Sequence, residues 1–338
     1  MNIAALTQGT NIPSSRFRVR QLCEPLRAQG YLIDELAAAK TAYPPTSKLG
    51  RVSWGIPSLL DAFQRALKTH PYDACIIQRE LISTIPSFEF LGKRPLISDI
   101  DDAIWLNKRG LAAANLAKFS DHIVVGNSYL ANHFSKYKAP VSVIPTSVDI
   151  DRFTAGMPSY RNRGYGVIGW SGTWGGYAYF APIASVIGQL LSKHQDWKIR
   201  FISDKKPNFP EIPASQLEYA TWTPEAEVLQ LQDIDIGLMP LDDSPWSLGK
   251  CSYKMLLYMA CGVPVVATNL GMNKELFDSA DIGYGVHSPD QWREALESLI
   301  NDSSSRFLKG KNGRALVQKN YSLGVAVDRW TTVLNSVS

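Results

Sequence analysis

The chain has few of the residues that build metal centres and disulfide frameworks. Its 338 residues include four cysteines and five histidines, and neither type shows the spacing of metal ligands. Cys23, Cys75, Cys251 and Cys261 lie in apolar or helical contexts, which favours reduced thiols in a cytoplasmic protein. We therefore predict neither a metal site nor a disulfide scaffold.

The chain also lacks a strong charge excess and an unbroken apolar span. The 35 Lys and Arg exceed the 31 Asp and Glu by four. This small positive charge is compatible with an anionic ligand or a peripheral membrane contact but requires neither, and we predict no nucleic-acid partner. Residues 164–192 hold no charged side chain, but they are interrupted by Gly172, Gly175, Gly176 and Pro182, which favours a strand, a turn and a buried helix over a membrane span. Met1 leads directly into an apolar run, so we expect no secretory signal.

Apolar strand-like runs alternate with helical segments twice along the chain, before and after an aperiodic stretch at 145–164 that we interpret as a linker. This alternation predicts an α/β fold with two doubly wound, parallel-sheet domains in tandem and a ligand cleft between them. The expected strands are 2–7, 31–36, 73–78, 95–100, 122–125, 141–144, 166–170, 197–202, 217–221, 234–239 and 263–267. The expected helices are 16–29, 58–69, 112–119, 129–136, 177–193, 224–232, 255–261, 273–277, 291–300, 304–319 and 321–334.

One stretch, residues 249–268, predicts a helix, a stop and a strand. Residues 255–261 are almost wholly apolar, as in a buried helix, and Gly262 stands where a left-handed cap would end it. Lys250 and Lys254 are four positions apart, so we expect them on one helical face near the first turn, where the helix dipole favours an anion. This pattern predicts a phosphate or diphosphate site, and the alternative is that both lysines extend into solvent.

A glycine-rich turn at 169–176 follows the first strand of the second half. Glycines let backbone N–H groups approach a phosphate, and Ser171 and Thr173 add hydroxyl donors around Gly172. The turn does not have the glycine spacing of a dinucleotide site or the nucleophile elbow of a serine hydrolase. A plain tight turn is the alternative to a phosphate site.

Carboxylates crowd the end of the strand at 95–100, where ligands bind in this class of fold. Asp99, Asp101 and Asp102 raise one another's pKa when close together, which suits a base or an acceptor for a hydroxyl proton. A helix cap by Asp101 or Asp102, or a magnesium or manganese site, are the alternatives.

Arginines crowd the start of the helix at 16–29. Arg16, Arg18 and Arg20 oppose the helix dipole there, which indicates an anionic group nearby. Ser14 or Ser15 is expected to cap this helix.

Taken together, these motifs resemble the GT-B fold glycosyltransferases of the family called glycosyl transferases group 1. The resemblance rests on 250–267, 15–18, 99–105, 126–130, 144–149, 235–241 and 321–322. It implies an N-terminal acceptor-side domain at 1–155, a C-terminal donor-binding domain at 165–318 and a last helix at 321–338 that crosses back to the first domain. The chain departs from the family pattern at Gly249 and Leu257, where the family has two glutamates, and in the 171–176 turn, which replaces the usual Arg and Lys.

The resemblance implies metal-independent, retaining transfer of a sugar from a UDP- or GDP-linked donor to an acceptor hydroxyl, with no further cofactor. The acceptor would be a glycan, a lipid-linked sugar or a protein in polysaccharide or glycolipid synthesis, in the cytoplasm or at the inner membrane face. Asp101 and Asp102 would be catalytic. Ser171, Gly172, Thr173, Lys250, Ser252, Tyr253 and Lys254 would bind the donor, and Ser15, Arg16 and Arg18 would lie on the acceptor side. The alternatives are a non-catalytic nucleotide- or glycan-binding protein of the same fold and, less well supported, a sugar-nucleotide epimerase.

Overall fold

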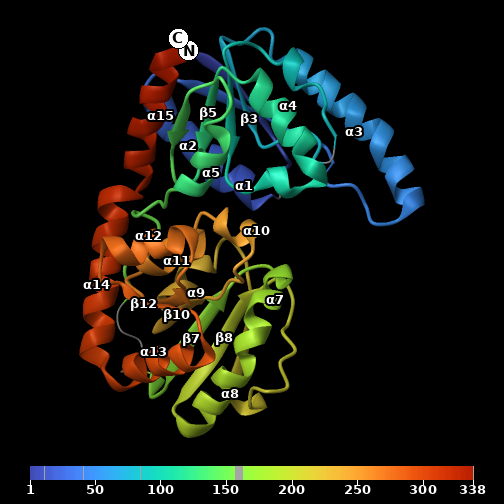
Figure 1. Ribbon diagram of the computed structural model, residues 1–338. Helices are drawn as coiled ribbons and strands as arrows, with labels where there is room; N and C mark the ends of the chain where they lie inside the picture. The colour runs from blue at the N-terminus through green and yellow to red at the C-terminus, as the bar shows by residue number, and fades with distance from the viewer. Residues whose placement is uncertain (11, 41, 84, 157–162, 338) are drawn as a thin grey trace. The chain divides into compact units, whose positions relative to one another are not determined.

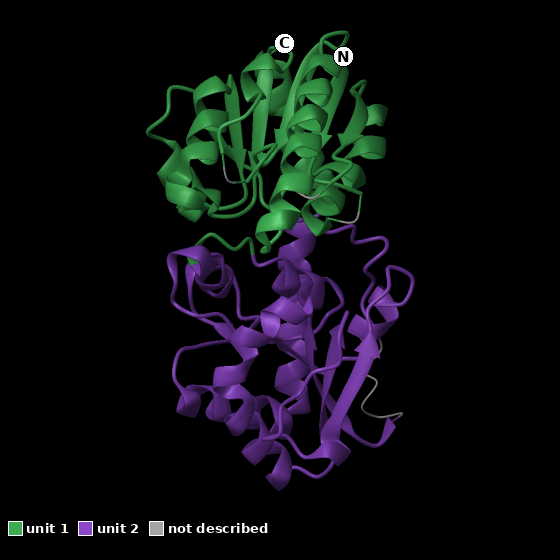
Figure 2. Cartoon of the chain, turned by 90° about the vertical axis from the view of Figure 1, so that its right-hand side faces the viewer, with its two compact units in different colours: residues 1–147, 248–251, 323–338 green, residues 148–247, 252–322 purple. Residues whose placement is uncertain are grey.

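The computed structural model describes residues 1–10, 12–40, 42–83, 85–156 and 163–337, which form two compact units (Figure 1) (Figure 2). Unit 1 consists of Met1–Ser147, Leu248–Cys251 and Leu323–Ser338, and unit 2 consists of Val148–Ser247 and Ser252–Ser322. The first division lies within the stretch that we interpreted as a linker. Two later segments of the chain therefore complete unit 1.

Unit 1 is built on six parallel strands in the order β2-β1-β3-β4-β5-β6. The strand order reverses between β1 and β3, so the carboxyl ends of these two strands mark the expected ligand crevice of this sheet. The predicted parallel sheet is confirmed. The strands are β1 (Asn2–Thr7), β2 (Leu32–Ala37), β3 (Ala74–Gln78), β4 (Leu96–Ile100), β5 (His122–Val125) and β6 (Val141–Val143).

Helices cover both faces of this sheet, and β3, β4 and β5 are therefore buried along their whole length. On one face α2 packs together with the last helix, α15, through residues such as Leu26 and Trp330. The helical elements are α1 (Pro13–Ser15), the π-helix η1 (Arg16–Arg20), α2 (Gln21–Ala28), α3 (Lys48–Lys68), η2 (Glu89–Leu91), η3 (Ile104–Leu106), η4 (Lys108–Gly110), α4 (Leu111–Phe119), α5 (Ser128–Phe134) and α15 (Leu323–Val337).

Two helices of unit 1 differ from the prediction. The helix expected at 16–29 begins earlier, at Pro13, with Ile12 as its cap, so the prediction that Ser14 or Ser15 caps it is wrong. The helix expected at 58–69 begins at Lys48, because Ser47 caps it by accepting the N–H of Gly50, and it continues through Pro57.

Unit 2 is built on a second set of six parallel strands, in the order β12-β11-β10-β7-β8-β9. Strand β12 was not predicted, because its sequence contains two glycines. Gly283 is required there, since a Cβ at this position would lie 1.8 Å from the carbonyl oxygen of Val265. The strands are β7 (Gly166–Ser171), β8 (Trp197–Ser203), β9 (Leu217–Thr221), β10 (Ile236–Met239), β11 (Val265–Thr268) and β12 (Gly283–Val286).

The core of unit 2 lies between one face of its sheet and helices α8 and α13, with the aromatic rings of Trp170, Phe180 and Phe201 at its centre. The helix expected at 177–193 forms three consecutive pieces, because Pro182 has no backbone N–H to continue one ladder. The helices are η5 (Trp174–Gly176), α7 (Tyr177–Phe180), η6 (Ala181–Ile183), α8 (Ala184–Lys193), η7 (Ala214–Gln216), α9 (Glu227–Gln232), α10 (Pro245–Leu248), α11 (Tyr253–Ala260), α12 (Gly271–Ser279), α13 (Pro289–Asn301) and α14 (Ser303–Asn320).

The predicted buried helix, stop and strand are confirmed as α11, Gly262 and β11. Gly262 has a φ of 77°, in the left-handed region that favours glycine. Its carbonyl oxygen lies where a Cβ at Gly310 would be, so α14 approaches α11 closely. Throughout the described ranges, no helix combines the length and the apolar character that crossing a bilayer requires.

Candidate active site

In unit 2, Lys254 lies over the glycine turn that follows β7. A Cβ at Gly172 would lie 2.7 Å from Lys254 Cε and 2.8 Å from Nζ, so the end of the lysine packs directly on this glycine. The Nζ also lies 4.7 Å from the centroid of the Trp170 ring. The strand order of this sheet reverses between β7 and β10, which marks the expected ligand crevice. Because α11 follows β10 in the chain, the Lys254 ammonium lies beside the glycine turn at this crevice.

Helix α11 also holds the glycine turn through Tyr258, which lies one helical turn after Lys254. The Tyr258 hydroxyl accepts a hydrogen bond of 2.7 Å from the Ser171 N–H. Tyr258 is fully buried, and burial raises the pKa of its hydroxyl, so the group stays neutral. Ser171 and Thr173 remain at least partly exposed in the turn, where their hydroxyls can reach a ligand.

Helix α11 begins with an unusual residue. Ser252 has φ 49° and ψ 25°, and its buried hydroxyl lies 2.6 Å from Asn273 Oδ1. Asn273 in turn donates to the Thr268 carbonyl at the end of β11, so Ser252 is tied to the protein itself. Tyr253, the first residue of the helix, is half-buried.

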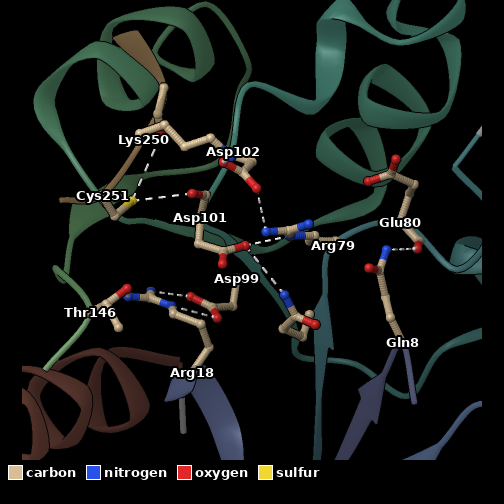
Figure 3. A network of polar contacts seen from close by, with 12 residues as sticks. Gln8, Arg18, Arg79, Glu80, Asp99, Asp101, Asp102, Thr146, Lys250 and Cys251 are labelled. Carbon is tan, nitrogen blue, oxygen red and sulfur yellow. Dashed lines mark hydrogen bonds and ion pairs between the residues drawn. The ribbon is translucent and has the colours of Figure 1, made fainter. Parts of the chain in front are cut away.

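Lys250 stands apart from Lys254. Because Ser252 is left-handed and α11 starts at Tyr253, the prediction that the two lysines share a helical face is wrong. Lys250 belongs to unit 1, where its Nζ lies 2.9 Å from Asp102 Oδ1 (Figure 3). Its charge is therefore already matched by a carboxylate.

The short segment Leu248–Cys251 packs on the carboxyl edge of the unit 1 sheet. The Cys251 Sγ lies 3.2 Å from the Asp101 carbonyl, and Asn127 Nδ2 donates to the Lys250 carbonyl at 3.1 Å. Glycine is required both at the sheet edge and in the segment that packs on it. A Cβ at Gly126, which follows β5, would lie 2.1 Å from Cys251 Sγ, and a Cβ at Gly249 would lie 2.7 Å from Ala103 Cβ.

Asp101 and Asp102 share one arginine, Arg79, which follows β3 (Figure 3). Its Nη2 lies 2.6 Å from Asp102 Oδ2, and its Nε donates to Asp101. Burial raises the pKa of Asp101, but the Arg79 charge outweighs it and holds that pKa below its usual value. Sequence reasoning missed Arg79, although its position at a strand end was a usable signal.

Arg18 and Asp99 form a second ion pair inside unit 1. Arg18 is 3% exposed and Asp99 is fully buried, with Arg18 Nε 3.0 Å from Asp99 Oδ2. Burial raises the pKa of Asp99, and the Arg18 charge opposes this rise. Arg18 also donates to the Ile144 carbonyl at 2.7 Å, so it joins η1 to the residue that follows β6 from within the unit.

The other two residues that the resemblance assigns to the acceptor side, Ser15 and Arg16, lie near this pair in the chain. Ser15 is fully buried, and its hydroxyl has no hydrogen-bond partner among the residues that the structure describes. Arg16 is partly exposed, with its guanidinium carbon 4.6 Å from the centroid of the Phe17 ring.

A further carboxylate, Glu80, was missed by sequence reasoning. It is 1% exposed, beside Gln8, whose Nε2 donates to the Glu80 carbonyl at 3.3 Å, at the strand-order reversal between β1 and β3 (Figure 3). Within the described ranges neither of its carboxylate oxygens has a hydrogen-bond partner. Burial raises the pKa of Glu80 to about 7, although its own N–H, Arg79 and Ser83 oppose this rise.

Comparisons with known proteins agree with this architecture. Residues 174–302 match the family described as glycosyl transferases group 1. Spore coat protein SA of Bacillus subtilis (strain 168) is 32% identical over 66 residues, which span 19% of this chain and 18% of that protein.

Two solved structures share the fold over almost the whole chain. Sucrose-phosphate synthase from Thermosynechococcus elongatus superposes with a TM-score of 0.73 at 12% identity, covering 99% of this chain and 98% of that one. Anabaena Alr3699/HepE, solved in complex with UDP-glucose, has a TM-score of 0.70 at 14% identity, covering 99% of this chain and 100% of that one. Most of unit 2 therefore matches the group 1 glycosyl transferases, and the chain as a whole has the GT-B fold of these solved structures.

Proposed function

We propose that this chain transfers a sugar from a nucleoside-diphosphate sugar to an acceptor hydroxyl, with the donor held by unit 2. The observation that carries the proposal is the Lys254 ammonium, which packs on Gly172 at the strand-order reversal between β7 and β10. A diphosphate carries the opposite charge, and the partly exposed Ser171 and Thr173 of the turn add hydroxyl donors for it. Anabaena HepE, which shares the fold, was solved with UDP-glucose, and this supports a UDP-linked donor here, with GDP as the alternative.

The chemistry of this proposal follows from where charge develops. As the bond between the anomeric carbon and the β-phosphate oxygen breaks, negative charge grows on the leaving diphosphate. Lys254 and the hydroxyls of Ser171 and Thr173 are the donors proposed for that charge, and donors that are already in place need little reorganisation during the reaction. The proposal therefore uses no metal ion and no cofactor besides the donor, and retention of configuration is part of it.

Unit 1 supplies the acceptor side in this proposal. A carboxylate near the acceptor can take the proton of the attacking hydroxyl, and Asp101 and Asp102 are the candidates. Both are held by Arg79, so either carboxylate accepts the proton only when that ion pair loosens. In this proposal the acceptor is a glycan, a lipid-linked sugar or a protein, and the product belongs to polysaccharide or glycolipid synthesis. The enzyme is cytoplasmic and makes a peripheral contact at the inner membrane face.

A second candidate function is nucleotide or glycan binding without catalysis. It is favoured by the matched charges of unit 1, where Arg79 and Lys250 both engage Asp102. It is also favoured by Leu257, which stands at the place of a family glutamate and is buried among apolar side chains. These features leave the donor turn intact, so the two candidates differ in turnover and not in nucleotide binding.

The first test is calorimetric titration of UDP and GDP into the wild type, Lys254→Ala and a control variant, Lys193→Ala. Lys193 is an exposed lysine of unit 2 at the last turn of α8. We expect one nucleotide to bind the wild type and the control, and to bind Lys254→Ala at least about tenfold more weakly, the loss of one charge-assisted contact. Binding of neither nucleotide to the wild type would overturn the proposal.

The second test is a donor screen by product mass with the purified chain and several sugar nucleotides. Turnover with one of them identifies the donor, and nucleotide binding without turnover of any donor favours the non-catalytic candidate. Asp101→Asn and Asp102→Asn in the same assay test the base. Undiminished turnover in both variants would remove these two residues from the mechanism.

A further inference from the structure

Helix α3 in unit 1 carries a stripe of large apolar side chains on its solvent side. Six such residues follow one another at intervals of three or four, which places them on one side of an α-helix. They are Leu49, Val52, Ile56, Leu60, Phe63 and Leu67, with exposed fractions of 87%, 69%, 65%, 55%, 38% and 40%. We call these six residues the α3 stripe.

The side of α3 that packs on unit 1 is made of small residues. Ser58, Ala62 and Ala66 are its buried positions, together with Arg65, whose Nε lies 2.8 Å from Asp61. A helix that only covers a sheet turns its large apolar residues inward. Because α3 does the reverse, the stripe is not needed to attach the helix to its own unit.

The first half of α3 extends beyond the rest of unit 1 (Figure 1). From Lys48 to Pro57 every residue is exposed or half-buried, and the first buried position is Ser58. The second half is anchored, in part through an edge-on contact between the rings of Phe63 and Phe88 at 5.3 Å. The most exposed residues of the stripe therefore lie on the half that projects.

The charges around the stripe are almost all positive. Between positions 38 and 70 the sequence holds five Lys or Arg and one Asp, and that aspartate is the one paired with Arg65. Lys40 lies along the helix, with its Nζ 3.3 Å from the Ser53 carbonyl. Lys48 and Lys68 stand at the two ends of α3 and are both exposed.

We propose that α3 is an interfacial helix whose stripe enters the headgroup region of a membrane while its flanking lysines bind anionic lipids. An exposed apolar stripe with cationic flanks on one helix is the pattern of helices that lie in the plane of a lipid surface. Anionic headgroups complement these cations at short range. The inference assigns a surface to the peripheral contact, and it stands independently of whether the chain transfers a sugar.

A second copy of the chain is a poorer occupant of the stripe. Pairing two α3 helices along the stripe would bring Lys48 and Lys68 of each copy next to the cations of the other, and like charges at close range repel. A lipid surface has no such conflict. Self-association is therefore the outcome that would contradict the proposal.

The test is co-sedimentation of the full chain with two kinds of vesicle, phosphatidylcholine alone and phosphatidylcholine mixed with phosphatidylglycerol. We expect binding to the anionic vesicles that weakens as salt is added, because salt screens the lysines. In the combined variant Leu49→Asn, Val52→Asn and Ile56→Asn, the binding constant should fall at least about 100-fold, because each side chain loses its apolar transfer.

A matched control places the same change in unit 2. Leu229→Asn, Phe307→Asn and Leu308→Asn replace three large apolar residues that are also exposed. Leu229 lies on α9 and the other two on α14, so they form no stripe along one helix, and vesicle binding should stay within about twofold of the wild type. Replacing Lys48 and Lys68 by alanine should weaken binding to anionic vesicles about fivefold for each cation and leave the remaining affinity for neutral vesicles unchanged.

Three results would overturn the proposal. The first is no sedimentation with either vesicle, and the second is equal binding by the α3 variant and the control. The third is a dimer in analytical ultracentrifugation that the α3 variant abolishes, which would make a second copy the occupant. Far-UV circular dichroism and UDP titration on the same variants check folding and the donor site. A failure of membrane binding therefore leaves the proposed function untouched, and the reverse also holds.

Discussion

The carboxyl edges of the two sheets differ in how they hold charge. In unit 1, buried carboxylates at the end of β4 are matched by Arg18, Arg79 and Lys250. In unit 2, the turn after β7 has no charged residue of its own, and Lys254 rests on a glycine and on the Trp170 ring. The same topology therefore presents ion-paired carboxylates at the edge of one unit and a lysine packed on a glycine turn at the edge of the other.

This difference indicates what each edge contributes. Buried ion pairs are expensive to break, because the partner left behind keeps its desolvation cost. The unit 1 edge is therefore a rigid structure into which a ligand has to fit. An ammonium group on a glycine turn adds a positive potential that an anion can approach, which suits the unit 2 edge for binding phosphate.

The largest expected effect tests the ion-paired carboxylates at the edge of unit 1. Arg79→Met leaves Asp101 and Asp102 without their shared guanidinium, and we expect the free energy of unfolding to fall by about 3–5 kcal/mol, the usual cost of an unpaired buried charge. Urea denaturation at neutral pH measures it. Lys274→Met is the control, since the pair Lys274–Asp278 is mostly exposed and its loss should cost less than about 1 kcal/mol. Equal effects of the two variants would show that the buried pairs do not define the unit 1 edge.

The next effect concerns Glu80, whose carboxylate oxygens have no hydrogen-bond partner among the described residues. Its pKa is raised from 4.5 to about 7 by burial, so the folded state binds its proton more tightly than the unfolded state does. The contribution of protonated Glu80 to the free energy of unfolding is fully present below pH 4.5 and is lost as the pH rises through about 7. Between acidic pH and pH 8 the free energy of unfolding should therefore fall by roughly 3 kcal/mol because of this one group.

Glu80→Gln removes this titration. The variant should therefore gain stability over the wild type as the pH goes from 5 to 8, by up to roughly 3 kcal/mol. Urea denaturation at both pH values measures the difference. Asp99 and Glu89, whose pKa values burial also raises, titrate in both proteins and cancel in the comparison. A constant offset between variant and wild type would mean that Glu80 is paired in solution.

A smaller effect tests the support of the unit 2 turn. Tyr258→Phe leaves the Ser171 N–H without its acceptor, and we expect stability to fall by about 1–2 kcal/mol, the cost of a buried unpaired donor. The turn should also loosen, so that UDP affinity falls a few-fold, about 1 kcal/mol by calorimetry. Tyr284→Phe, which removes an exposed hydroxyl contact with Ser298, is the control and should change stability by less than about 0.5 kcal/mol.

The smallest effect separates the two lysines. Lys250→Ala removes a partly exposed partner of Asp102 and should cost about 1 kcal/mol of stability. Because Lys250 belongs to unit 1, UDP affinity should stay within about twofold of the wild type, in contrast to Lys254→Ala. Equal losses of UDP affinity in both variants would return Lys250 to the donor site.

The sheets could be predicted from the sequence because buried parallel strands are short apolar runs that local residues delimit. Strands β1, β5 and β9 have the predicted bounds, and Gly262 ends α11 in the predicted conformation. Strand β12 was missed, since glycine replaces the apolar signal where backbones touch. These features depend on residues that are neighbours in the chain, so they can be predicted from the local sequence.

The partners of the charges could not be predicted. Asp101 and Asp102 were correctly placed at a strand end, but their arginine comes from β3, which is adjacent only because of the strand order. Lys250 and Lys254 were assigned one helical face, and a single left-handed residue, Ser252, separates them. Such pairings depend on contacts between distant segments, which one sequence does not encode locally.

The segment Leu248–Cys251 has a consequence for the order in which the chain is made. Lys250 leaves the ribosome 148 residues after Asp102, and α15 follows at the very end. Unit 1 therefore completes its carboxyl edge only after Val148–Ser247 of unit 2 have been synthesised, and one sheet face only after Ser252–Ser322 as well. A fragment that stops at Ser147 would lack both pieces. A chimera that exchanges unit 2 with a relative has to keep 248–251 and 323–337 from the parent of unit 1.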